Sequence, residues 1–192
     1  MDKPIIITVG RQFGSGGKLL ACELGKRLSI PVYDKELITA AAEKSGIGEE
    51  FFEKRDEKRR TLYIGMRSGM DDEMLFRIQS EAIREIAAKG SAIFVGRASD
   101  YVLRDMDCLD IFISAPFEER VKRVCEREGM SEKAARTFVQ KQDKGREDYY
   151  NFFTFTRWGN AANYDLCIDS SILGIEGTAD FVIDFLKKKG TI

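Results

Sequence analysis

The chain has 192 residues, of which 43% are hydrophobic and 33% are charged, and its formal net charge is −1. This length and balance indicate a globular protein with one core, and we expect a single domain over residues 1–192. A net charge so near zero excludes a global field that would draw the protein to nucleic acid or to a membrane, so we expect neither as a partner. The sequence contains no histidine, which excludes histidine triads, histidine metal sites and imidazole general bases.

The four cysteines, Cys22, Cys108, Cys125 and Cys167, form no CxxC pair and lie in apolar or helical contexts. They are typical of buried free thiols in a reducing compartment. The apolar run at the start of the sequence is too short for a signal peptide, and no other run has the length of a membrane span. We therefore expect a cytoplasmic protein.

The first 34 residues predict a strand, a glycine-rich loop, a helix and a second strand. Residues 4–9 (PIIITV) form an apolar run that indicates a buried strand. A helix is expected over residues 17–28, where leucines recur every four residues along one face. The weaker run IPVYD at residues 30–34 indicates the second strand.

Helices dominate the next part of the chain. The apolar spacing predicts one helix over residues 35–45 and a long amphipathic helix over residues 71–89, which ends at Gly90. Residues 46–70 between them carry the least pattern of the whole sequence. Two interpretations of this stretch stay open: a mobile flap, or a short surface helix with a solvated run of charges.

The second half continues the alternation of strands and helices. Apolar runs at residues 91–96, 108–115 and 164–169 indicate strands, and helical patterns cover residues 117–128 and 175–189. Strands that are apolar throughout and alternate with helices predict an α/β fold with a parallel sheet covered on both faces. Right-handed crossovers then bring the carboxyl ends of the strands to one edge, where ligands bind.

The glycine-rich loop is the strongest chemical signal. Gly14, Ser15, Gly16 and Gly17 follow a strand and open an amphipathic helix. Glycines let the backbone wrap around an anion, and the start of a helix offers it N–H groups and a partial positive charge. The loop therefore predicts a phosphate cradle.

The usual pattern GxxxxGK[ST] is not matched in either register. If Lys18 is the lysine, Leu19 stands in the place of the hydroxyl; if Gly16 is the last glycine, Gly17 stands in the place of the lysine. Lys18 could bend back towards a phosphate on its flexible stem, and Arg11 could supply charge from the other side. An apolar side chain cannot ligate a hard cation, so the metal ligand stays unknown.

The chain resembles cytidylate kinase, and more closely the bacterial cytidylate kinase-like proteins, from Ile5 to Leu186. The similar segments come in order along the chain: FGSGGK, LLACELGKRLSIPVYD, VGRASDYVL, DIFISAPFEERVKR, DKGR and LCIDSSILGIEG. The resemblance implies a three-layer P-loop kinase fold with a five-stranded parallel sheet, helices on both faces and a helical lid. It also implies transfer of the γ-phosphoryl group of ATP, with Mg²⁺, to a nucleoside monophosphate or a similar small acceptor.

The resemblance also implies where each substrate lies. Residues 35–90 would form the helical region on the acceptor side, and residues 131–160 the lid with an aromatic insert. Donor phosphates would be held by Gly14, Ser15, Gly16, Gly17 and Lys18, with Ser170 by the donor base. The acceptor would meet Asp34, Lys35 and Arg97. The catalytic cations would be Lys18 and Arg11 at the loop and Lys144 and Arg146 in the lid, with Asp143 as their neighbour.

Placed on the family's buried helix face, the leucines of residues 17–28 put Gly17 at the lysine's position and Leu19 at the hydroxyl's. The family's serine after the aspartate of the second strand is here Lys35. The nature of the acceptor therefore stays open.

Simpler structural roles compete with these assignments. Arg97 could form a salt bridge instead of meeting a ligand, and Arg120 is expected to pair with glutamates on the helix surface. Lys144 and Arg146 are two residues apart, so they converge only if Gly145 breaks the helix or the lid moves; a solvated charged helix is the alternative.

An aromatic run follows the basic residues of the lid. Its rings could stack on a base, but a packed interface within the chain or between two chains is the favoured interpretation, which makes a homo-oligomer a possible assembly. The run comprises Tyr149, Tyr150, Phe152, Phe153, Phe155 and Trp158.

The altered loop leaves two functions open. The first is an ATP-dependent phosphotransferase acting on a nucleotide-like acceptor. The alternative is a non-catalytic nucleotide-binding or regulatory protein that keeps the fold but has lost metal-assisted transfer.

Overall fold

The computed structural model describes residues 4–48 and 69–192. Within these residues the strands form one parallel sheet with the order β2-β3-β1-β4-β5. The strands are β1 (Ile6–Arg11), β2 (Val32–Tyr33), β3 (Ala92–Val95), β4 (Leu109–Ser114) and β5 (Leu166–Asp169). The five predicted strands and their parallel arrangement are confirmed, with shifts of one or two residues at most ends.

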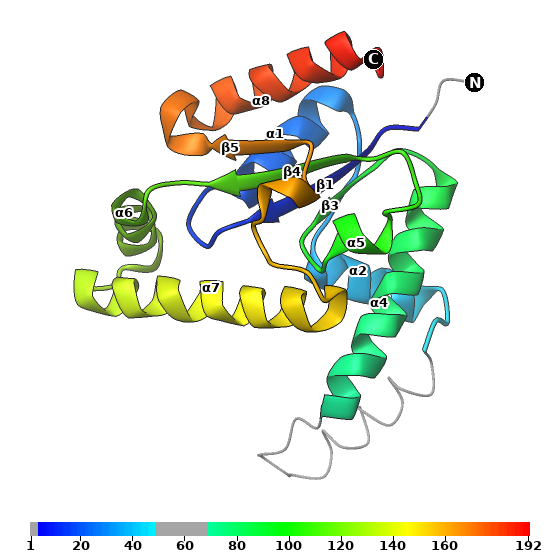
Figure 1. Cartoon of the computed structure of the whole chain (residues 1–192), viewed down its shortest axis with the longest axis horizontal. Coiled ribbons are helices and arrows are strands. Elements are labelled where there is room, and N and C mark those ends of the chain that lie inside the picture. The colour runs from blue at the N-terminus through cyan, green and yellow to red at the C-terminus, as the bar shows by residue number, and fades with distance from the viewer. Residues whose placement is uncertain (1–3, 49–68) are drawn as a thin grey trace.

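Helices cover both faces of this sheet. Figure 1 shows α1 and α8 on one side of it, and α2, α4, α5 and α7 on the other. The helices are α1 (Gly17–Leu28), α2 (Lys35–Lys44), α4 (Gly69–Lys89), α5 (Ser99–Val102), α6 (Phe117–Glu128), α7 (Glu132–Thr154) and α8 (Ser170–Lys189), with a short 3₁₀ turn η1 (Ala161–Asn163). Almost all of the unpatterned stretch 46–70 lies outside the described residues.

The alternation of side chains along β1 explains the two covered faces. Ile7 and Val9 are fully buried against α1 and α8, whereas Ile6 packs with α2 and α4 on the opposite face. Because a strand turns successive side chains to opposite sides, a run that is apolar throughout can sit only in a sheet covered on both faces. The loop after β1 is therefore anchored on a rigid strand at the carboxyl edge of the sheet.

One open alternative about local structure is decided, and one prediction is wrong. The helix α7 runs without a break through Gly145, which agrees with the alternative of a charged helix. The four cysteines are free, but Cys22 and Cys167 are exposed instead of buried. Among the described residues, no helix combines the length and apolarity that a membrane span requires.

The aromatic run packs largely within the chain. The Phe153 ring stacks on Phe76 of α4 with ring centroids 4.2 Å apart, and Trp158 contacts Phe112 of β4 edge-on at 5.4 Å. These contacts fasten the end of α7 to α4 and to the sheet. Phe152 and Phe155 are 58% and 90% exposed, so a homo-oligomer through these two rings stays a prediction.

The carboxylate of Asp110 gives the fold a predictable pH dependence. Asp110 lies on β4 and accepts a hydrogen bond from the Thr8 hydroxyl. Burial, with smaller contributions from Asp100 and Asp165, raises the pKa of Asp110 to about 6. The folded state thus holds this proton more tightly than the unfolded state, so stability is greatest below the unfolded pKa and falls as the pH rises towards about 6.

We expect Asp110→Asn to raise the free energy of unfolding at pH 7.5 by about 2 kcal/mol, because a neutral amide removes the buried charge. Urea unfolding of both chains between pH 4 and 8 measures this, and the gain should shrink at low pH. Asp184→Asn, an exposed carboxylate on α8, is the matched control. An equal gain at pH 4 and pH 7.5 would contradict the assignment.

Candidate active site at the glycine-rich loop

The loop between β1 and α1 takes a conformation that needs its glycines. Gly14 and Gly16 have φ values of 78° and 82°, in the left-handed region. A Cβ atom at Gly14 would lie 2.9 Å from the Arg120 carbonyl oxygen, and one at Gly16 would lie 2.5 Å from the Ile175 side chain. The backbone therefore turns tightly between α6 and α8, which only glycine allows at these two positions.

This conformation leaves the start of α1 open to an anion. Gly16 is the N-cap and no side chain caps the helix among the described residues. The first N–H groups of a helix have no partner within it and carry partial positive charge. The predicted cradle is thus present as backbone geometry, with Ser15 buried and its hydroxyl donating to the Gln12 carbonyl at 2.9 Å.

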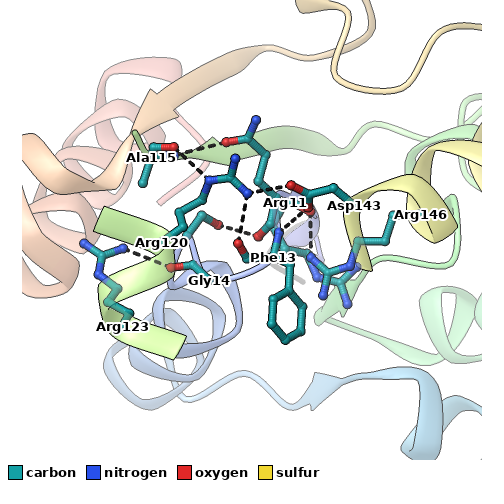
Figure 2. A network of polar contacts seen from close by, with 10 residues as sticks. Arg11, Phe13, Gly14, Ala115, Arg120, Arg123, Asp143 and Arg146 are labelled. Atoms are coloured by element: carbon teal, nitrogen blue, oxygen red, sulfur yellow. Dashed lines mark hydrogen bonds and ion pairs between the residues drawn. The ribbon is translucent and has the colours of Figure 1, made fainter. Parts of the chain in front are cut away.

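Three arginines hold the carbonyl groups of the loop (Figure 2). Arg146 of α7 donates to the Arg11 carbonyl at 2.9 Å, Arg120 to the Phe13 carbonyl at 3.1 Å, and Arg123 to the Gly14 carbonyl at 3.3 Å. The loop is therefore preorganised by cations from α6 and α7.

Asp143 of α7 joins the loop to this arginine set. Its carboxylate accepts from the Phe13 N–H at 2.6 Å and from Arg120 at 2.5 Å. Arg120 is buried, and it also donates to the Ala115 carbonyl at 3.0 Å. The expectation that Arg120 pairs with glutamates on the helix surface is wrong, because this face of α6 lies against the loop.

Positive charge concentrates where the phosphates would lie. Burial, and after it the nearby charges of Arg146 and Arg97, lower the pKa of Arg11 to about 9, against the opposing charges of Asp34 and Glu36. Burial also lowers the pKa of Arg146. Like charges held together at a half-buried edge favour the binding of a polyanion, which would relieve their repulsion.

Lys18 and Asp34 form the side of the site next to β2. The Lys18 ammonium lies 2.6 Å from the Asp34 carboxylate, and the Lys18 side chain is 64% exposed. Asp34 also caps α2 by accepting from the Leu37 N–H at 3.2 Å, and Lys35 is the exposed first residue of that helix. Burial raises the pKa of Asp34, but the hydrogen bonds from Lys18 and from Leu37 outweigh it and leave the pKa below its usual value.

Arg97 follows β3 at the same edge. Its guanidinium lies over the Tyr149 ring, 3.9 Å from the centroid. Arg97 and Ala98 both have positive φ, 61° and 53°. Two consecutive left-handed residues without glycine are strained, and such strain is concentrated at functional sites.

The structure separates the two predicted lid cations. Because α7 is straight, Arg146 faces the loop while Lys144 pairs with Glu147 and Asp148 at 3.2 Å and 2.9 Å. Lys144 lines a surface groove of about 390 Å³ with Arg120 and other residues of α6 and α7. Lys144 and Arg146 therefore do not converge, as expected of a helix that Gly145 does not break.

Ser170 has a supporting position. It is fully buried, and its hydroxyl donates to the Ser15 carbonyl at 2.5 Å. Sequence reasoning placed it beside the donor base; the structure places it against the backbone of the loop. Arg123, which sequence reasoning missed, contacts the same hydroxyl at 3.4 Å. The one signal for it in the sequence is its position in an amphipathic helix, five residues before the end.

The residues present fit phosphates but not a protein-bound magnesium ion. Leu19, in the place of the usual hydroxyl, is 64% exposed. Among the described residues, no group of three or more carboxylates and thiols could hold a metal ion. Magnesium prefers oxygen ligands and keeps several waters, so phosphate oxygens would have to supply the ligands that this loop lacks.

Known proteins with similar sequence and structure cover nearly the whole chain. A crystal structure of an uncharacterised protein from Eubacterium ventriosum is 32% identical, has a TM-score of 0.77, and the match covers 95% of this chain and 98% of that one. Shikimate kinase from Bacteroides thetaiotaomicron shares the fold at a TM-score of 0.58 and 14% identity, over 96% and 99% of the two chains.

Curated relatives agree with this likeness. The cytidylate kinase of Pyrococcus abyssi is 30% identical over 190 residues, 96% of this chain and 97% of its own. That of Thermococcus kodakarensis is 29% identical over 191 residues, 97% and 91% of the two chains. The family model described as the cytidylate kinase-like family matches residues 6–172. The chain therefore belongs to the cytidylate kinase-like family.

Proposed function

We propose that this protein transfers the γ-phosphoryl group of ATP to the phosphate of a nucleoside monophosphate. The observation that carries the proposal is the open start of α1 within a glycine loop, with the guanidinium groups of Arg11, Arg97 and Arg146 near one another at its edge. Phosphoryl transfer depends on positioning and on neutralising charge, and this edge offers backbone donors and cations together. Membership of the cytidylate kinase-like family supports the same reaction class.

The acceptor group is better explained as a phosphate than as a hydroxyl. A hydroxyl acceptor needs a general base. Of the two carboxylates beside the loop, Asp143 is engaged by Arg120 and the Phe13 N–H, and Asp34 has its pKa lowered by its ion pair with Lys18. A carboxylate held in this state is a weak base. A phosphate monoester is already largely ionised at neutral pH, since its second pKa is about 6, and needs no base.

The proposed step is a direct displacement. An oxygen of the acceptor phosphate forms a bond to the γ-phosphorus, and the bond from that phosphorus to the β–γ bridging oxygen breaks. The bridging oxygen keeps the electron pair, so ADP leaves. We assign no step to magnesium, which would enter with ATP and be held by its phosphates and by water.

The roles of the residues follow from where they lie. The amides of Gly14–Gly17 and of Lys18 would hold the donor phosphates, and Arg146 would neutralise the transferred group. Arg97 would meet the acceptor phosphate, and Asp34 with Lys35 would face the rest of the acceptor. Ser170 supports the loop from behind.

An assay of ADP release with ATP, Mg²⁺ and a panel of nucleoside monophosphates and nucleosides tests the proposal. We expect turnover with at least one monophosphate and none with the corresponding nucleoside, because the cations of the site require an anionic acceptor. Transfer to nucleosides but not to monophosphates would contradict the assignment of the acceptor.

The second candidate is a nucleotide-binding protein without transferase activity. The exposed Leu19 in the place of a magnesium ligand favours it. It predicts that ATP binds with the same affinity with and without Mg²⁺, and that no member of the panel is phosphorylated. Magnesium-dependent binding together with turnover would exclude it.

A further inference from the structure

The side chain of Arg11 fills the space in which the usual phosphate-binding lysine would begin. A Cβ atom built on Gly17 would lie 2.6 Å from the Cβ atom of Arg11 and 3.1 Å from its Cγ atom. The colliding atoms are close to two backbones, at the end of β1 and at the start of α1, so neither can easily move aside. As long as Arg11 lies here, position 17 has no room for a side chain.

A second glycine makes room for the other end of Arg11. A Cβ atom at Gly96 would lie 1.8 Å from Nη1 of Arg11 and 2.8 Å from its Cζ. Gly96 directly follows β3, the neighbour of β1 in the sheet. The Arg11 side chain therefore runs from one glycine to the other along the carboxyl edge of the sheet, beside the loop.

The guanidinium of Arg11 has like charges around it. The charges of Arg146 and Arg97 lower its pKa, whereas Asp34 and Glu36 act on it only through their charge. Among the described residues, no group accepts a hydrogen bond from the Arg11 side chain. A planar cation with several donors and no engaged acceptor is suited to a phosphate group, which it can hold by two parallel hydrogen bonds.

Lys18 does not compete for this role in the structure. It is one residue later in the helix, its side chain is mostly exposed, and its ammonium is bound to Asp34 at 2.6 Å. Its charge is thus directed to the side of β2.

We propose that Arg11 is the cation that holds the transferred phosphate, moved from the start of α1 to the end of β1, and that Gly17 and Gly96 are required because they make room for it. This inference rests on the proposed function only where it says that the bound phosphate is the one transferred. The binding of a phosphate by Arg11 does not depend on the proposed function. The arginine at position 11 therefore requires the glycine at position 17. A lysine at the helix start and an arginine at the strand end exclude each other.

Binding of inorganic tripolyphosphate, measured by calorimetry, tests the charge of Arg11 without any assumption about the acceptor. We expect Arg11→Met to weaken binding about 10- to 100-fold, as the loss of a charge-assisted hydrogen-bonded pair does. Arg11→Lys should lose less, because it keeps the charge but not the planar fork. Arg84→Met removes an exposed arginine of α4 and should bind as the native chain does. Full affinity in Arg11→Met would overturn the proposal.

The exclusion between positions 11 and 17 is tested by restoring the usual lysine. Gly17→Lys alone should bind tripolyphosphate at least about 10-fold more weakly, because its Cβ atom collides with Arg11. In the Arg11→Gly background, which removes the colliding Cβ atom, Gly17→Lys should recover at least about 10-fold over Arg11→Gly alone. A Gly17→Lys chain that binds as well as the native one, or a double variant no better than Arg11→Gly, would overturn the exchange.

A stability measurement keeps the steric part testable if a lysine variant does not fold. Gly17→Ala should lower the unfolding midpoint in the native background and lower it less in the Arg11→Gly background; equal losses would refute the collision.

The two proposals fail in different ways. If Arg11→Met binds tripolyphosphate more weakly but no chain transfers phosphate, only the proposed function is removed. If Arg11→Met binds tripolyphosphate as the native chain does and transfer is normal, only this inference is removed.

Discussion

Replacement of Arg146 by methionine is expected to lower the rate of phosphoryl transfer roughly 100- to 1,000-fold, with a smaller effect on ATP binding. The magnitude is that of removing one preorganised donor from a charged transition state. Arg146 donates to the Arg11 carbonyl, so its guanidinium group is already fixed beside the loop before any substrate binds. Because no reorganisation is needed, its charge contributes where charge develops during transfer, and kcat should fall more than KM rises.

Two lysines of α7 provide controls for this prediction. Lys141→Met removes an exposed charge from the same helix and should leave kcat unchanged. Lys144→Met tests the second predicted lid cation by itself. We expect kcat to fall no more than about 3-fold, because Lys144 is paired in solvent with Glu147 and Asp148. A folded Arg146→Met chain that keeps its rate, or a Lys144→Met chain that loses as much, would contradict the assignment.

The sequence was sufficient to predict the frame of the site. The apolar runs predicted each strand, and the spacing of leucines in α1, compared with the buried helix face of the family it resembles, put Gly17 at the lysine's position. These signals are local, since period and composition are carried by neighbouring residues. The class of site followed from the same local pattern, because glycines between a strand and a helix leave N–H groups free for an anion.

The side chains that complete the site could not be predicted in this way. Arg120 lies on a helix rich in glutamate, so its sequence neighbours suggested surface ion pairs, and only the packing of α6 on the loop shows that it is buried. Gly145 left a break in the helix open as one alternative, but a glycine within a helix costs only about 1 kcal/mol, which the packing of α7 offsets. The exclusion between Arg11 and Gly17 depends on distances between separate elements, which no pattern along the chain records.

The ion pair of Asp143 with Arg120 leads to the largest expected effect on stability. Arg120 is 7% and Asp143 20% exposed, and their charged atoms lie 2.5 Å apart. Removal of one partner of a buried pair leaves the other charge without compensation, so Asp143→Ala should lower the free energy of unfolding by about 3–5 kcal/mol. Urea unfolding at pH 7.5 measures this loss. Glu132→Ala, which breaks the exposed pair with Arg136, should cost less than about 1 kcal/mol.

A double-mutant cycle distinguishes this pair from simple loss of packing. If the two charges compensate each other, Arg120→Met in the Asp143→Ala background should cost at least about 1 kcal/mol less than it does alone. Additive losses would mean that each side chain acts separately, Asp143 through the Phe13 N–H and Arg120 through the carbonyls of Phe13 and Ala115. Since the same carboxylate fixes the loop amide and the arginine that holds the loop carbonyl, the coupling measured by unfolding should reappear in the affinity for tripolyphosphate. Stability and phosphate binding would then be lost together when the link between α7 and the loop is cut.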